Sequence, residues 1–404
     1  MKTQQRIHSP FSPWLGATLL LAALLTNAWA QAQTVTLTPK GSYAGFDAYD
    51  VQVAGRYAYV AAANRLLVTD VGDPSQPQLV GSVSGPVLGS CGAFAVRVVG
   101  DYAYVGASCG GLVVLDVKDP TQPRAVGTNE AFAYYVRVEG HYAYVTSEGG
   151  GMHIIDVSDP AHPVRVGSYN PDGLVRPEYV LGKYAYARVE GSGGGGDSGL
   201  EVIDVSDPSN PVRVGSYAGW FPMDVVGNYG YLIGGGALGI IDLSNPSNPV
   251  LVGTYRTGGN VAALRVVGSY AYMNVYGDFG ERLEVVDVTD PAHPQAVGRR
   301  TLSSFPFVVS LEVVGNTVYV GGILNKGLLI YEASTPAPAV LRFNPPLRSG
   351  DKLNLSWNGG AGIKLQTTPS LTAPNWQDVP GTDGASSIEL PLTDPSAFFR
   401  VVKP

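Results

Sequence analysis

The chain has 404 residues, of which 45% are hydrophobic and only 15% are charged, and this composition excludes a generally disordered protein. The 52 glycines and 30 prolines are too many for a helical protein and lack the three-residue period of collagen, so we expect an all-β chain with many short strands. The formal net charge is -7 and no cluster of lysine and arginine is present, which argues against nucleic acid or an anionic membrane as a partner.

Residues 1–30 have the pattern of an export signal. Lys2 and Arg6 give a positive start, and an apolar run follows over residues 15–25. Ala28-Trp29-Ala30 is a small-x-small cleavage site, whereas the apolar run is short for a bilayer span. We expect cleavage after Ala30 and an exported protein, without a membrane span, in the periplasm, on the cell surface or outside the cell.

A segment with an apolar triplet and a following acidic residue recurs along the chain. The acidic residues are Asp70, Asp116, Asp156, Asp204, Asp242, Asp287 and, in a degenerate seventh copy, Glu332. Their spacings of 38 to 48 residues, with four β-like runs in each copy, are typical of propeller blades. A solenoid of helix pairs would need helical periodicity, which these segments lack.

The second copy illustrates the predicted blade. Its strands are residues 95–99, 102–106, 111–117 and 124–128. A turn at residues 119–123 separates the last two strands, because the prolines of Asp-Pro-x-x-Pro fix φ and cannot donate to a ladder. Triplets such as Val113-Val114-Leu115-Asp116 and Ile154-Ile155-Asp156 resemble the motif of the LVIVD-repeat family. This resemblance covers roughly residues 35–332 and implies an exported or surface bacterial β-propeller, with little said about chemistry.

The seventh copy lacks an Asp-Pro turn and a fourth strand. Residues 35–43 end in Gly41-Ser42-Tyr43, which matches Gly167-Ser168-Tyr169 in the fourth strand of another copy. We therefore expect the first strand after the signal to complete the last blade and to leave no open edge. The prediction is a closed seven-bladed ring over residues 31–332.

The repeats stop at a predicted stiff linker, residues 333–338 with the sequence Ala-Ser-Thr-Pro-Ala-Pro. Residues 339–404 carry short alternating runs, among them 352–357 and 397–402, which suit a small β-sandwich. Leu365-Gln366-Thr367-Thr368 and neighbouring runs resemble a C-terminal module of large exported bacterial proteins, and this resemblance supports export.

Two recurring positions are defined by their sequence separation from the turn glycine of each blade. The fourth residue after the glycine is always tyrosine, and we expect these rings to fill the core between blades: Tyr59, Tyr104, Tyr144, Tyr186, Tyr231, Tyr272 and Tyr319. The third residue before the glycine is always polar, and these residues are Gln52, Arg97, Arg137, Tyr179, Asp224, Arg265 and Glu312. Because the next residue is always valine, strand alternation places the polar set on the opposite face, near the axis.

The central channel is one of two candidate sites. Arg265 lies in the blade between those of Asp224 and Glu312, so we expect ion pairs across blades. These charges serve either as structural braces or as a site for an anion or another ligand.

The face that carries the loops between fourth and first strands, and between second and third strands, is the other candidate. Six residues before the turn glycines, or next to that position, it offers Tyr49, Tyr134, Arg176, Trp220 and Phe221. These side chains either grip a sugar or a peptide or cap the core.

Cys91 and Cys109 flank the first hairpin of the second copy. Pairing Val99 with Tyr102 across the turn brings the two cysteines nearly opposite each other, so we expect a disulfide in an oxidising compartment. A metal site would need more ligands than this pair.

Catalytic motifs give little support to an enzyme. Gly196-Asp197-Ser198-Gly199 resembles the nucleophile motif of serine proteases, but it lies in a glycine-rich loop of a repeat. We expect a monomeric, non-catalytic binding or scaffolding protein for a protein or glycan partner, without cofactor or metal. The alternative is a propeller-type carbohydrate hydrolase or lyase that uses carboxylates such as Asp224 and Glu312.

Overall fold

The computed structural model describes most of the chain after its first 33 residues. The described residues are 34–89, 92–129, 132–147, 149–171, 173–191, 198–277, 280–302 and 308–334, followed by 347–349, 352–356, 364–368, 376–382, 385–391 and 398–402. The chain divides into two compact units, and residues Thr34–Ser334 form the larger one. The predicted export signal lies outside the described residues and stays a prediction.

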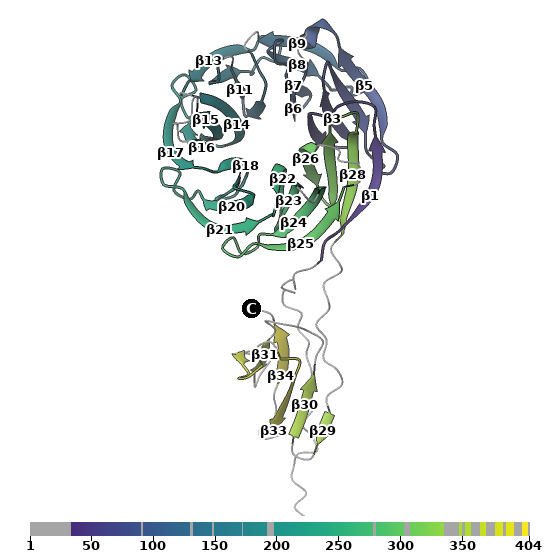
Figure 1. Ribbon diagram of the computed structural model, residues 1–404, viewed down its shortest axis with the longest axis vertical. Helices are drawn as coiled ribbons and strands as arrows, with labels where there is room; N and C mark the ends of the chain where they lie inside the picture. Colours follow the sequence, from purple (N-terminus) through teal and green to yellow (C-terminus); the bar gives the residue numbers. More distant parts are fainter. Residues whose placement is uncertain are drawn as a thin grey trace, which may run out of the picture. The chain divides into compact units, whose positions relative to one another are not determined.

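Seven four-stranded antiparallel sheets surround a central axis in the larger unit, which confirms the predicted all-β propeller with seven blades (Figure 1). Blade 1 contains β2 (Asp50–Ala54), β3 (Tyr57–Ala62), β4 (Arg65–Asp70) and β5 (Gln78–Ser84). Blade 2 contains β6 (Ala95–Val99), β7 (Tyr102–Gly106), β8 (Leu112–Asp116) and β9 (Arg124–Asn129). Blade 3 contains β10 (Val136–Glu139), β11 (Tyr142–Thr146), β12 (Met152–Asp156) and β13 (Val164–Tyr169). A short 3-10 turn, η2 (Pro86–Leu88), precedes blade 2.

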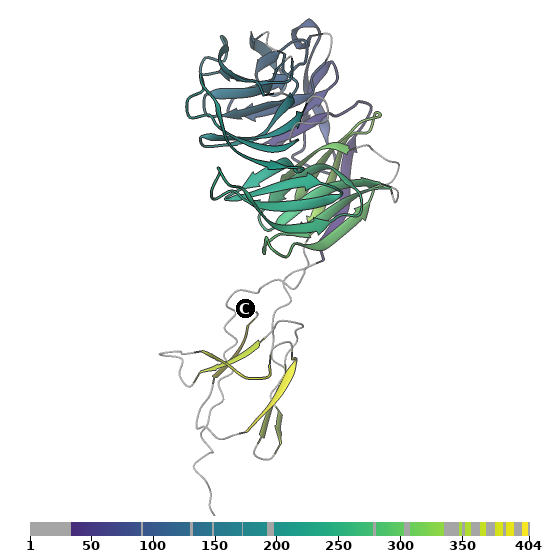
Figure 2. The same ribbon diagram turned by 60° about the vertical axis from the view of Figure 1, so that its left-hand side comes forward.

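The remaining blades have the same order, with the innermost strand first and a visible twist in each sheet (Figure 2). Blade 4 contains β14 (Gly173–Leu181), β15 (Tyr184–Gly191), β16 (Gly199–Asp204) and β17 (Val212–Ala218). Blade 5 contains β18 (Phe221–Val226), β19 (Tyr229–Gly234), β20 (Ala237–Asp242) and β21 (Val250–Arg256). Blade 6 contains β22 (Asn260–Val267), β23 (Tyr270–Gly277), β24 (Gly280–Asp287) and β25 (Gln295–Thr301). The seventh sheet contains β26 (Val308–Val314), β27 (Thr317–Gly322), β28 (Gly327–Ser334) and β1 (Thr36–Tyr43).

The seventh sheet combines the two ends of the larger unit. Strand β1 runs antiparallel to β28, with Thr36 opposite Ser334 and Tyr43 opposite Leu328. Strand β28 continues through Ala333 and Ser334, so these two residues of the predicted linker belong to the sheet. Residues 335–338 lie outside the described part of the chain.

A glycine in the fourth strand lets each blade approach the next. A Cβ atom on Gly167 would lie 1.9 Å from the carbonyl oxygen of Pro208 in the Asp-Pro turn of the following blade. The equivalent glycines, each within 2.5 Å of a neighbouring backbone oxygen by the same measure, are Gly41, Gly81, Gly127, Gly215, Gly253 and Gly298. Only a residue without a Cβ fits these positions, which explains the recurring glycine of the repeat.

The hydrophobic core lies between adjacent blades. Tyr59, Leu66 and Val68 of blade 1 pack with Val96 and other residues of blade 2, and the pattern repeats around the ring. The seven tyrosines predicted to fill this space are only 3% to 7% exposed, which confirms their core position. The fold is therefore held by packing between blades.

The aspartates of the Asp-x-x-Asp-Pro turns cap the backbone. Asp70 accepts a hydrogen bond from the amide of Gly72 at 2.9 Å, and Asp73 accepts one from the amide of Ser75 at 2.9 Å. His162 and His293 each contact the second aspartate of their turn, at 2.9 Å. Local turn geometry thus accounts for these residues.

The described residues of the C-terminal unit form two three-stranded sheets. One contains β29 (Leu347–Ser349), β30 (Lys352–Ser356) and β33 (Ser387–Pro391), and the other contains β32 (Gln377–Asp378), β31 (Lys364–Thr368) and β34 (Phe398–Val402). Leu353, Leu355, Leu365, Val379 and Phe399 share one buried cluster. In the described parts of both units, no helix is long and apolar enough to cross a membrane.

Candidate functional site

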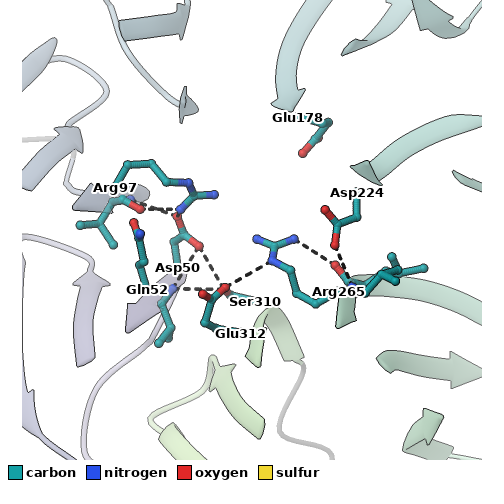
Figure 3. Close-up of polar contacts among 12 residues, drawn as sticks. Asp50, Gln52, Arg97, Glu178, Asp224, Arg265, Ser310 and Glu312 are labelled. Carbon is teal, nitrogen blue, oxygen red and sulfur yellow. Dashed lines mark hydrogen bonds and ion pairs between the residues drawn. The ribbon is translucent and has the colours of Figure 1, made fainter. Parts of the chain in front are cut away.

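The axis of the ring is lined by a belt of charged side chains from the innermost strands. Asp50, Arg97, Glu178, Arg265 and Glu312 converge there from β2, β6, β14, β22 and β26 (Figure 3). The sequence predicts one polar residue per blade at this level, and Arg97, Arg137, Asp224, Arg265 and Glu312 line one cavity. We refer to these residues, together with Asp50 and Glu178, as the axial belt.

Asp50 and Arg97 join blades 1 and 2. The Arg97 guanidinium lies 2.7 Å from Asp50 Oδ2, and both side chains are about seven-eighths buried, with exposed fractions of 14% and 13%. Asp50 also accepts the backbone amide of Val96 at 3.0 Å and the hydroxyl of Ser310, in blade 7, at 3.0 Å. Burial alone would raise the pKa of Asp50, but the positive charges of Arg97 and Arg137 and the Val96 amide lower it.

Arg137 and Glu178 join blades 3 and 4. The Arg137 Nε atom donates to the backbone carbonyl of Glu178 at 2.5 Å, and its guanidinium lies 3.6 Å from the Glu178 carboxylate. Burial, with repulsion from Arg97, lowers the pKa of Arg137 to about 9. The side chain therefore stays protonated at neutral pH.

Arg265 provides the ion pair expected between blades 6 and 7. Its Nε atom donates to Glu312 Oε2 at 3.3 Å. Burial raises the pKa values of Asp224 and Glu312, against the opposing effect of Arg265. For Arg265 itself, burial would lower the pKa, but Asp224 and Glu312 outweigh it and raise the pKa.

Gln52 and Asp224 occupy equivalent positions and make equivalent contacts across blades. Gln52 Oε1 accepts the amide of Val98 at 2.7 Å, and Asp224 Oδ2 accepts the amide of Val266 at 2.8 Å. Both amides belong to the axial edge of an innermost strand. Side chains of the preceding blade thus satisfy backbone groups that would otherwise face the channel.

The axial belt separates two chambers. The lower chamber, of about 370 Å³, lies toward the turn glycines. It is lined by Asp224 and Glu312 of the belt and by Glu139, Tyr179 and valines. The upper chamber, of about 140 Å³, lies toward the loop face. It is lined by Asp50 of the belt and by Tyr49, Phe94, Tyr135, Arg176 and Arg188. Arg97, Arg137, Glu178 and Arg265 line both chambers.

An aromatic row forms one side of the upper chamber and its rim. The Phe94 ring lies 5.0 Å from the Tyr49 ring and is stacked on the Tyr134 ring at 4.4 Å, and Tyr134 contacts Tyr135 at 5.1 Å. Tyr49, Phe94 and Tyr134 are partly buried. The structure therefore brings together rings from three blades, among them Tyr49 and Tyr134, which the sequence assigns to one face.

Arg176 and Arg188 continue the row in blade 4. The Arg176 guanidinium lies 4.8 Å above the Tyr135 ring, and that of Arg188 lies 4.1 Å above the Phe221 ring. Phe221 thus supports an arginine, and it is not among the residues that line the chamber. The sequence did not single out Arg188, because it lies opposite Arg176 only as a result of the register shift between Pro177 and Tyr179.

Trp220 is placed differently from the other predicted rim residues. A Cβ on Gly239 would lie 2.7 Å from the Trp220 ring, and one on Gly234 would lie 3.0 Å from it. The ring packs against the glycine backbone of its own blade and against the core cluster of blades 4 and 5. This position accounts for Trp220 by packing.

Ser198 of the protease-like motif has a structural contact. Its hydroxyl accepts the amide of Gly191 at 3.1 Å, while the other residues of the motif before Gly199 lie outside the described part of the chain. Among the described residues, no group of three or more histidine, cysteine, aspartate or glutamate side chains could hold a metal ion.

Cys91 lies outside the described residues, so the structure does not describe the predicted disulfide. The backbone at Gly89, two residues before Cys91, lies close to the backbone at Gly110, next to Cys109. A Cβ on Gly89 would lie 2.7 Å from the amide nitrogen of Gly110. The pairing of Cys91 with Cys109 stays a prediction.

Comparisons with known proteins agree with this architecture. The family described as LVIVD repeat matches residues 45–84, 92–130, 133–171, 179–219, 223–257 and 258–301. No curated protein matches the chain in sequence. Blade 7, the degenerate copy, is outside the matched residues.

Similar solved structures are propellers of distant sequence. The β-propeller domain of Myceliophteria thermophila Cps50 (Swd1) has a TM-score of 0.56 at 11% identity, over 74% of this chain and all of that one. A chain of the mitotic checkpoint complex has a TM-score of 0.56 at 13% identity, over 78% of this chain and 99% of that one. The computationally designed protein Ika8 has a TM-score of 0.51 at 10% identity, over 75% of this chain and all of that one. At these identities the likeness shows the fold alone.

Proposed function

Because the chain belongs to the LVIVD repeat family, we propose that it is a binding or scaffolding protein that engages a protein or glycan through the loop face of its propeller. The upper chamber carries this proposal. There, aromatic rings of blades 1 to 3 and two arginines of blade 4 line one cavity at the loop face. Aromatic and arginine side chains in a partly desolvated pocket are the groups that dominate binding energy in protein interfaces.

A non-catalytic role is favoured by the state of the axial carboxylates. Asp224 accepts two backbone amides, at 2.9 Å and 2.8 Å, and Glu312 is held by Arg265 at 3.3 Å. A hydrolase or lyase would need one carboxylate that is open to substrate as an acid and a second as a base or nucleophile. The contacts of Asp224 and Glu312 support bracing instead.

The proposal is tested by screening the full chain against glycan arrays and in pull-downs from its native surroundings. Phe94→Ala and Tyr134→Ala should each reduce capture of the partner, because they remove contact area at the rim. Val164→Ala is the matched control, since Val164 is 57% exposed on an outer strand. Capture that is unchanged in both rim variants, or polysaccharide turnover that Asp224→Asn abolishes, would contradict the proposal.

The same proposal includes export of a monomer with a C-terminal β-sandwich. The export pattern of residues 1–30 supports it, and so does the buried cluster shared by the two C-terminal sheets. Export predicts that the protein recovered from the expressing cells begins after Ala30, which intact-mass measurement checks.

A disulfide between Cys91 and Cys109 fits an exported protein. The close approach of Gly89 and Gly110 supports it. Peptide mapping without reduction should find the two cysteines in one linked pair, and quantitative alkylation of both in the native protein would exclude it.

Closure of the ring by β1 also belongs to the proposal. Its pairing with β28 supports closure, and so do two contacts of β1 with its neighbouring blades. A Cβ on Gly41 would lie 2.2 Å from the Pro74 carbonyl oxygen of blade 1, and one on Gly298 of blade 6 would lie 2.5 Å from the Val35 carbonyl oxygen. Gly41 thus meets the Asp-Pro turn of blade 1 as other fourth-strand glycines do, and Val35, next to β1, takes the place of the missing Asp-Pro turn of blade 7.

A further inference from the structure

Two arginines face each other in the hairpin of blade 4. Arg176 of β14 is directly opposite Arg188 of β15, and like charges in such a pair destabilise a sheet. Glu190 is near both, with its Oε1 atom 3.5 Å from the Arg176 guanidinium and 2.7 Å from Arg188 Nε. The single carboxylate of Glu190 thus forms ion pairs with both guanidinium groups.

The hydrogen bonds of this cluster are incomplete. The Nε atoms of Arg176 and Arg188 and the Oε1 atom of Glu190 are buried, and none has a partner with hydrogen-bond geometry. The 2.7 Å approach of Arg188 Nε to Glu190 Oε1 is therefore a charge contact without a well-aligned hydrogen bond. The Arg176 and Arg188 side chains are 24% and 22% exposed, so a ligand reaches their guanidinium groups at atoms other than the buried Nε. A carboxylate that does so gains charge-assisted hydrogen bonds.

The five arginines that line the upper chamber are not equally paired. Arg97 is paired with Asp50 at 2.7 Å, Arg137 with Glu178 at 3.6 Å, and Arg265 with Glu312 at 3.3 Å. Arg176 and Arg188 share the single carboxylate of Glu190. The positive charge that an anionic ligand can balance therefore lies on these two arginines of blade 4.

The shape of the chamber limits the ligand. Its volume of about 140 Å³ is well below the roughly 300 Å³ at which pockets for drug-sized ligands begin, so it holds a single small group. Guanidinium forks match the planar geometry of a carboxylate. The Tyr135 ring is covered by Arg176 at 4.8 Å, but the rings of Tyr49 and Phe94 offer an apolar wall that suits the C–H face of a sugar ring.

A peptide that adds as a strand to the axial edge of a blade would find few free backbone groups there. The axial amides of Val96, Val98 and Val266 already donate to Asp50, Gln52 and Asp224 of the preceding blades. Strand addition depends on such edge groups being available.

We propose that the upper chamber is a subsite for the carboxylate of an acidic sugar, in which Arg176 and Arg188 hold the carboxylate and the aromatic wall holds the ring. The inference rests on the proposed function and narrows its partner to a glycan that contains uronic acid. Arg188 and Arg176 act as binding residues in this assignment.

The first experiment titrates the full chain with D-glucuronate, D-glucose and acetate, and follows binding by ligand-observed NMR. Glucuronate should bind at least about tenfold more tightly than either comparison compound, because only it offers both the carboxylate and the ring. Equal binding of glucose would overturn the role of the arginines. Equal binding of acetate would overturn the role of the sugar ring, and the absence of glucuronate binding would overturn the whole inference.

The second experiment measures glucuronate binding by Arg176→Gln and Arg188→Gln. Each should weaken binding at least about tenfold, the loss of one charge-assisted hydrogen bond. Arg124→Gln is the control, because Arg124 is 75% exposed on an outer strand and should bind as the unaltered chain does. If a glutamine variant does not fold, Arg188→Lys keeps the charge without the planar fork and should still weaken binding. Unchanged binding by the folded arginine variants would contradict the inference.

The two proposals fail in different ways. If the arginine variants bind uronates normally while Phe94→Ala and Tyr134→Ala lose their partner, the subsite is wrong and the proposed function stands. If glucuronate does not bind and the screens find no partner of the loop face, both proposals fail.

Discussion

Asp50 is the residue at which three blades meet. Its carboxylate receives the Arg97 guanidinium and the Val96 amide from blade 2, and the Ser310 hydroxyl from blade 7. A carboxylate with several donors in a buried place is strongly favoured in its charged form. The neutral amide of asparagine cannot replace it, because its nitrogen is itself a donor.

We predict that Asp50→Asn destabilises the protein by about 3 kcal/mol at pH 7, since it leaves the buried Arg97 charge without its partner. The pKa of Asp50 is lowered in the folded state, so its contribution is fully present above the unfolded pKa of about 3.9 and is lost as the pH falls through the folded value. Urea unfolding at several pH values should therefore show a difference between the two proteins that shrinks below about pH 4.

The matched control for Asp50 is the exposed pair of Arg124 and Asp116, in which Arg124 is 75% exposed. Asp116→Asn should change the free energy of unfolding by no more than about 1 kcal/mol. If Asp50→Asn costs no more than this control, the axial belt is not a brace.

Strand alternation in the sequence predicts some of the axial residues but not all of them. It placed Arg97, Arg265 and Glu312 at the axis, but it missed Glu178, because the register of β14 shifts between Pro177 and Tyr179 and the carboxylate turns inward. A proline within a predicted strand is a signal for such a bulge. Asp50 could have been found from alternation, since it lies two residues before Gln52.

At the scale of the strand, the fourth-strand glycine is the point of contact between neighbouring blades. Each such glycine faces a backbone carbonyl of the next blade, as Gly167 faces Pro208. The repeat pattern identified Gly-Ser-Tyr as a fourth strand, yet it gave no reason for the glycine. The reason lies in a residue of another blade, which periodicity within one repeat does not reveal.

Gly167→Ala should destabilise the ring by about 2 kcal/mol or more, because the added Cβ would lie 1.9 Å from the Pro208 oxygen and the rigid turn must move. Thermal unfolding measures the change. Gly277→Ala is the control, since its Cβ would meet only the Cα atom of Gly259, at an ordinary 3.4 Å. Equal melting temperatures for the two variants would show that the turn yields at little cost.

At the scale of the whole ring, β1 pairs with β28, and by our proposal this pairing closes the propeller. Leu37 is only 4% exposed and belongs to the core cluster of blades 6 and 7, whereas its neighbour Thr38 is exposed. The match between residues 41–43 and other fourth strands predicted this strand from sequence. The C-terminal unit offered no repeat to compare, so its predicted sandwich rests on strand alternation and on the resemblance of a few short runs to a known module.

Leu37→Asp should lower the melting temperature and promote self-association, because a charge in the core displaces β1 and exposes the edge of β28. Thr38→Asp adds the same charge one residue away on the exposed side and should leave both properties unchanged. Thermal unfolding and size-exclusion chromatography compare the two variants. The ring does not depend on β1 if Leu37→Asp behaves like Thr38→Asp.

The pairing of Thr36 with Ser334 also sets the order in which the molecule can be completed. Synthesis proceeds from the N-terminus, so β1 is made before the other strands of the propeller, and its partner β28 is the last of them. Six blades can form from their own consecutive strands while β1 still has no partner strand. The final assembly step is then a contact between residues almost 300 positions apart, and contacts of such long sequence separation are slow to form. The nascent chain thus carries an unpaired strand until the last strand of the propeller has been made.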